Sequence, residues 1–231
     1  MNNFGSAPSQ LGVRPSAELA QRLLTHAFGC MFAGLLLTAG VAAVVQTSET
    51  LTRFALQYFL LLIIGQLALV FVISGAINRL SATAALGLFF VYAASLGLTT
   101  GLVVQLYTGG SVATAFLSAS AMFGAAAIYG AVTKRSLAQL GGILFMGLVG
   151  LIVAMLLNLF LHSSQLSWII SIIGVVLFTA LTAYDVQRIQ SGDIAAATGS
   201  VEKGAVIGAL RLYLDFINLF FFLLRLTGGR R

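Results

Sequence analysis

The fold is decided by residues 166–187, which read LSWIISIIGVVLFTALTAYDVQ and carry no charge before Asp185. An α-helix needs about 20 mostly apolar residues to cross the hydrocarbon core of a bilayer. Six further blocks of this kind lie at residues 23–45, 54–77, 82–106, 111–133, 140–161 and 204–226. Proline occurs only at positions 8 and 15, so none interrupts a block. The sequence therefore predicts an all-α integral membrane protein with seven transmembrane helices.

The overall composition supports the same class. Of the 231 residues, 59% are hydrophobic and 8% are charged, whereas soluble domains carry about 25% charged residues. A soluble enzyme, a secreted domain and a disordered regulator are excluded. The net charge of +6 comes from single basic residues between apolar blocks, a pattern that sets membrane orientation and does not indicate nucleic acid. We divide the chain into a polar N-terminal tail (1–21), a seven-helix domain (22–227) and a short basic C-terminal tail (228–231).

The scattered basic residues predict a cytoplasmic N-terminus. If all seven blocks span, seven Lys or Arg residues lie on the cytoplasmic side and four lie opposite: Arg14, Arg22, Arg79, Lys134, Arg135, Arg188 and Lys203 against Arg53, Arg225, Arg230 and Arg231. A re-entrant seventh block would return the three arginines of the tail to the cytoplasm and change the count to ten against one. We favour seven spans, because the last block is long enough to cross and irregular backbone needs protein or water around it.

Two aspartates lie inside apolar blocks. Asp185 is near the end of the sixth block and Asp215 is midway through the seventh, with Arg211 one helical turn before it. An ionisable residue at the centre of a membrane helix costs about 2.5–3.5 kcal/mol on insertion scales and is a functional candidate by default. The structural alternatives are an Arg211–Asp215 ion pair within one helix and an interfacial position for Asp185.

The two aspartates are predicted to meet across consecutive antiparallel helices. Asp215 lies eleven residues after Gly204, about 16 Å into the helix. Carboxylates in contact do not both ionise easily, so such a pair can hold a proton near neutral pH. Their oxygens also suit weak, transient calcium binding. Arg79, which closes the second block on the same side, is a candidate latch for Asp185 or, equally, a membrane anchor.

The chain resembles the transmembrane Bax inhibitor motif family over about residues 20–227. The resemblance rests on three stretches: IGVVLFTALTAYDVQRI at 173–189, LYLDFINLF at 212–220, and the junction from Phe123–Gly124 through Tyr129–Gly130 to Thr133–Leu137. It implies a seven-helix fold with a central seventh helix and a proton-sensitive calcium leak through a paired-aspartate site. Asp185 and Asp215 occupy the matching positions.

The sequence departs from the family pattern at several places. Ser136 stands where the family often has Asp, and Arg211 stands where animal members carry a second acidic residue. The Lys-rich C-terminal tail of animal members is absent. The chain therefore looks like a bacterial member of the family, located in the inner membrane. Bacteria lack the apoptotic partners that gave the family its name.

Other chemistry has weak support in the sequence. His26 and His162 are assigned to packing or surface roles rather than metal binding. No nucleotide or serine-hydrolase signature is found, so we expect neither an enzyme nor a cofactor. Two alternatives to the calcium leak remain: an interaction protein that modulates a membrane-bound protease, and a proton-coupled transporter. The expected partners are lipid, calcium and protons, and the expected oligomeric state is a monomer.

Overall fold

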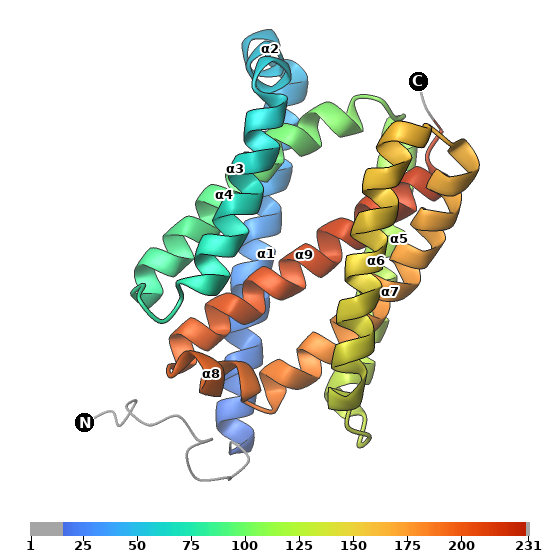
Figure 1. The fold of residues 1–231 in the computed structure, drawn as a ribbon. Helices are drawn as coiled ribbons and strands as arrows, with labels where there is room; N and C mark the ends of the chain where they lie inside the picture. Colours follow the sequence, from blue (N-terminus) through green and yellow to red (C-terminus); the bar gives the residue numbers. More distant parts are fainter. Residues whose placement is uncertain (1–15, 230–231) are drawn as a thin grey trace. The chain divides into compact units, whose positions relative to one another are not determined.

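The computed structural model describes residues 16–229, and all their regular elements are helices. In chain order these are α1 (Ala17–Thr47), α2 (Glu49–Gln57), α3 (Phe59–Gly75), α4 (Ala82–Val104), α5 (Gly109–Val132), η2 (Ala138–Leu140), α6 (Gly141–Leu161), α7 (Ser164–Gln190), α8 (Asp193–Thr198) and α9 (Val201–Thr227) (Figure 1). The all-α membrane fold is confirmed. Most of the predicted N-terminal tail, together with Arg230 and Arg231, lies outside the described residues.

By length and composition, six of these helices can cross a membrane. The predicted second block is broken at Tyr58, where α2 and α3 meet at 74°, and the pair adds a seventh span if it is counted as one. The break follows the sequence: α2 carries Glu49 and Arg53, which form an i,i+4 ion pair at 2.6 Å, whereas the 17 residues of α3 include no charged side chain. Residues 54–57, which the sequence assigned to the span, therefore belong to the polar helix.

The helices form two compact units. Unit 1 comprises the chain through Leu106 together with Ile189–Tyr213, and unit 2 comprises Tyr107–Arg188 together with the residues from Leu214 onward. Helices α7 and α9 each contribute to both units. In the most apolar window of α9, 78% of the residues are buried, against 11–44% for the other candidate spans. The last helix is thus the most buried of the candidate spans.

Unit 1 is built on the contact between α1 and α4. The buried residues of α1 recur every three or four positions and form one stripe: Ala20, Leu23, Ala27, Met31, Gly34, Thr38, Ala42 and Val45. On α4, a Cβ atom added at Gly97 would lie 2.6 Å from the Val41 Cβ, and one added at Gly101 would lie 2.7 Å from the Val45 Cβ. Gly97 and Gly101 are spaced as Gly-x-x-x-Gly, which lets two helix backbones approach closely.

Tyr213 of α9 completes the core of unit 1. Its hydroxyl lies 2.6 Å from Thr38 Oγ1, and Thr38 in turn donates to backbone carbonyls of α1 and α4. The Tyr213 ring packs edge-on against Phe89 and Tyr92, with centroids 5.5 and 5.8 Å away. A buried tyrosine needs a partner for its hydroxyl, and this one fixes the position of α9 two residues before Asp215.

Candidate functional site

Both sequence-predicted aspartates are buried in unit 2. Asp185 lies on α7, five residues before its last residue, Gln190, and Asp215 lies near the middle of the 27-residue α9. Each is 4% exposed. Since α9 begins at Val201, Asp215 is fourteen residues or about 21 Å from its start, one turn deeper than the sequence suggested. Both side chains are enclosed by protein, and the interfacial position of Asp185 stays an alternative.

The contacts between α7 and α9 establish an antiparallel register. Within unit 2, a Cβ atom added at Gly174 would lie 2.5 Å from the Phe222 ring. The rings of Phe178 and Phe222 are 5.9 Å apart. Within unit 1, a Cβ atom added at Gly208 would lie 3.0 Å from the Ile189 side chain. Early residues of α7 therefore contact late residues of α9, and late residues of α7 contact early ones.

This register brings the two aspartates to the same level of the helix pair. Asp185 follows Phe178 by seven residues, and Asp215 precedes Phe222 by seven residues. Seven residues are close to two helical turns, so each aspartate lies on the same helix face as a residue that contacts the other helix. The register therefore predicts that the carboxyl groups of Asp185 and Asp215 face each other.

Close packing on α5 and α6 holds the segment of α7 that carries Asp185. A Cβ atom at Gly130 of α5 would overlap the backbone of Ala183, so the backbones of these two helices are in close contact there. A Cβ atom at Gly141 of α6 would lie 2.5 Å from the Tyr184 hydroxyl. The residues directly before Asp185 are thus fixed on two sides.

Gln187 fastens the same segment of α7 to the connection between α5 and α6. Its Oε1 accepts from the Leu137 amide at 2.7 Å, and its Nε2 donates to the Arg135 carbonyl at 2.9 Å. Leu137 also packs in a buried cluster with Ala126 and Ala183. The side chain of Arg188 extends over the Tyr184 ring, with 5.5 Å between its Cζ and the ring centroid. Gln187 therefore ties the position of α7 to the Lys134–Leu137 loop.

Aromatic rings hold the α9 side of the site. Phe216, the residue after Asp215, packs edge-on against Phe116 and Phe123 of α5, with centroids 5.6 and 5.5 Å away. These contacts pack α9 against α5 in unit 2, next to the buried Asp215. Ring packing of this kind also limits rotation of the helix, which fixes the direction of the carboxyl group.

Three further residues from the sequence analysis, Arg211, Ser136 and Arg79, lie in three different parts of the fold. Arg211 is half-buried on α9, one turn before Asp215. Ser136 lies in the loop that Gln187 binds, and its Oγ accepts from the Ala138 amide at 3.4 Å. Arg79 lies in the turn after α3, where its amide bonds to the Ala76 carbonyl. Arg79 belongs to unit 1 and Asp185 to unit 2, and the latch between them stays a prediction.

Sequence reasoning missed two residues that position the helices of the candidate site. Gln187 and Tyr213 both lie within the stretches that carried the family resemblance, yet neither was singled out. For Tyr213, a signal was present: a lone tyrosine among apolar residues requires a hydrogen-bond partner when it is buried. For Gln187 no signal existed, because its partners are backbone groups some fifty positions away in the chain.

Comparison with known proteins identifies the family. The family described as Bax1-I, Inhibitor of apoptosis-promoting Bax1, matches residues 20–231. The chain belongs to this family. A Bax1-I relative, the inner membrane protein YbhL of Escherichia coli strain K12, is 44% identical over 225 residues, which cover 95% of this chain and 96% of YbhL.

Further relatives have no assigned activity. Uncharacterized proteins of Borreliella burgdorferi and Deinococcus radiodurans are 40% and 43% identical over 218 and 214 residues. Each alignment covers 92% of this chain, and 94% and 93% of the respective relative. The Bax1-I match and the apolar helices together make this chain a multi-pass membrane protein embedded in lipid.

Proposed function

We propose that this protein is a pH-sensitive calcium leak of the bacterial inner membrane, gated by protonation of Asp185 and Asp215. The observation that carries the proposal is the α7–α9 register, which predicts facing carboxyl groups on two buried helix segments. Calcium is the cargo of this site and not a resident cofactor, and the protein is proposed to act as a monomer without enzymatic activity.

The chemistry of the pair supports gating by protons. Two carboxylates at the same level of a low-dielectric helix pair repel when both are ionised, so one of them takes up a proton readily. Lower pH neutralises Asp185, weakens its hold on a basic partner such as Arg79, and frees the helices to part. Ionised carboxylate oxygens are ligands that calcium accepts, and two carboxylates are too few for tight binding. Such a site would let calcium ions pass through rather than hold them. Protonation also removes the charge that attracts calcium, so the leak should peak at mildly acidic pH.

The experiment that tests the proposal is calcium entry into liposomes containing only this protein. Protein-dependent entry that changes with pH supports the leak. If no calcium enters, the alternative of an interaction protein that modulates a membrane-bound protease is favoured. If protons are taken up only when a substrate is present, proton-coupled transport is favoured. The similarity to YbhL, an inner membrane protein, supports the inner membrane as the proposed location.

Arg79→Ala is expected to raise the calcium leak at neutral pH. If the guanidinium holds ionised Asp185, its loss removes a charge-assisted hydrogen bond that keeps the helices together. The measurement is the initial rate of calcium entry at pH 7 and pH 6, with Arg53→Ala as the control because Arg53 pairs locally with Glu49. Unchanged rates and unchanged pH dependence in a normally inserted variant would leave Arg79 only an anchoring role.

The N-terminus is expected to be cytoplasmic, from the basic residues between the apolar blocks. In membrane vesicles, a protease cleavage site placed before Ser16 should be cut only from the cytoplasmic side. A reporter fused after Arg231 should be active only on the opposite side. Cytoplasmic activity of that C-terminal reporter would contradict the seventh crossing.

A further inference from the structure

A cavity of about 580 Å³ opens where α1, α4 and α9 begin. All the residues that line it belong to unit 1, whereas Asp185 and Asp215 belong to unit 2. The cavity is therefore a feature separate from the carboxylate pair. Its lining comes from the first four turns of α1 and the first two turns of α4 and α9.

The lining changes from charged to apolar. Glu18, Arg22 and His26 are exposed and follow one another at intervals of four residues, which places them on one face of α1. Glu202 of α9 joins them from across the cavity. Apolar side chains form the remaining wall, among them Leu19, Leu86 and Val206. A charged mouth with an apolar wall suits a ligand that has a polar head and a hydrocarbon tail.

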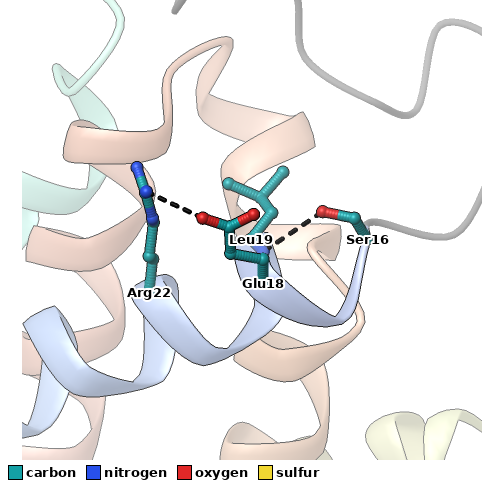
Figure 2. Close-up of polar contacts among 4 residues, drawn as sticks. All are labelled: Ser16, Glu18, Leu19 and Arg22. Carbon is teal, nitrogen blue, oxygen red and sulfur yellow. Dashed lines mark hydrogen bonds and ion pairs between the residues drawn. The ribbon is translucent and has the colours of Figure 1, made fainter.

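The charges at the mouth have both signs. Arg22 Nη2 lies 2.8 Å from Glu18 Oε1, and both side chains are more than half exposed (Figure 2). Glu202 accepts a hydrogen bond from Ser200 at 2.7 Å. A purely anionic head group would meet two carboxylates, and a simple cation would meet the guanidinium. A zwitterion satisfies both, because its phosphate pairs with Arg22 and its ammonium pairs with Glu18 or Glu202.

The length of α1 places this mouth at the depth of lipid head groups. Its 31 residues span about 46 Å, whereas the hydrocarbon core of a bilayer is about 30 Å thick. Because the apolar block of α1 begins at residue 23, its first turns, which carry Glu18 and Arg22, are an end that extends beyond the hydrocarbon. Cys30 lies twelve residues or about 18 Å after Glu18, at the apolar end of the lining.

We propose that this cavity binds a zwitterionic aminophospholipid of the phosphatidylethanolamine type. The phosphate is held by Arg22, with support from the partial positive charge at the starts of three helices. The primary ammonium is held by the carboxylates of Glu18 and Glu202. One acyl chain lies along Leu19, Leu86 and Val206 towards Cys30.

Cys30 is the only cysteine in the chain and lines the cavity, so it reports occupancy directly. The full-length protein in detergent is treated with N-ethylmaleimide, and alkylation of Cys30 is followed by intact mass. Dioctanoyl phosphatidylethanolamine should slow the reaction saturably, by about fivefold at four times its Kd. Dioctanoyl phosphatidylglycerol, phosphatidylcholine and free glycerophosphoethanolamine at the same concentration should protect much less.

Two sets of variants make the test specific. Arg22→Gln and Glu202→Gln change exposed side chains and should abolish the preference for phosphatidylethanolamine without changing the lipid-free rate. In the control, Cys30→Ala with Leu36→Cys moves the thiol to a site on α1 that is 58% exposed, and no selective protection is expected. Equal protection by all lipids, unchanged preference in both variants, or a Cys30 that fails to react without lipid would overturn the proposal.

Discussion

Asp215→Asn is expected to lower calcium entry into liposomes by about tenfold or more, since a loss of ~1.4 kcal/mol of interaction with the passing ion gives that factor. Asparagine keeps the shape and one oxygen of the side chain but removes its charge. Asp215 is buried in the middle of α9, where screening by water is weakest and the effect of a charge is largest.

The matched control for this variant is Asp193→Asn. It removes one negative charge from the exposed start of the short helix α8, so the change in net charge is the same. Calcium entry should then remain near the wild-type rate. If Asp215→Asn carries calcium as fast as Asp193→Asn, the central helix does not provide the ion-binding charge.

Gly130→Ala is expected to destabilise the protein by about 1–3 kcal/mol, the usual cost of overpacking. The added Cβ would overlap the Ala183 backbone, and backbone cannot move aside as a flexible side chain can. The shift would act on α7 two residues before Asp185, so altered calcium entry should accompany the loss of stability. Thermal unfolding in detergent provides the measurement of stability.

Gly124→Ala is the control on the same helix. Nothing lies within 4 Å of a Cβ atom at Gly124. Since alanine favours a helix over glycine by up to about 1 kcal/mol, this variant should be neutral or more stable. The two substitutions are chemically identical, and their predicted effects on stability have opposite signs. Equal melting temperatures for both would show that α5 and α7 do not approach closely at Gly130.

The helices could be predicted from sequence because long apolar blocks specify them locally. The block at 204–226 corresponds to α9 and the block at 166–187 to α7, each within a few residues. The break at Tyr58 was missed, because Phe54, Ala55 and Leu56 at the end of α2 extend the apolar run of α3 across it. The glycines differ in role: a Cβ atom added at Gly97 or Gly101 would meet α1, whereas one added at Gly124 would meet nothing within 4 Å.

The candidate site was predictable in its residues but not in its geometry. Asp185 and Asp215 stand out in sequence because charge is rare inside apolar blocks. Their common level depends on which turns of α7 and α9 meet, and that is set by Gly174, Phe178 and Phe222. The cavity beside α1 was missed, because it needs residues of three helices that are distant in the chain.

The most direct test of the central claim is calcium entry into liposomes between pH 5 and 8 for wild type, Asp185→Asn and Asp215→Asn. Wild type should show a maximum at mildly acidic pH. Asp185→Asn, which mimics the protonated residue, should give a flattened pH response, and Asp215→Asn should give low entry throughout. Identical, pH-independent curves for all three proteins would contradict gating by a proton shared between Asp185 and Asp215.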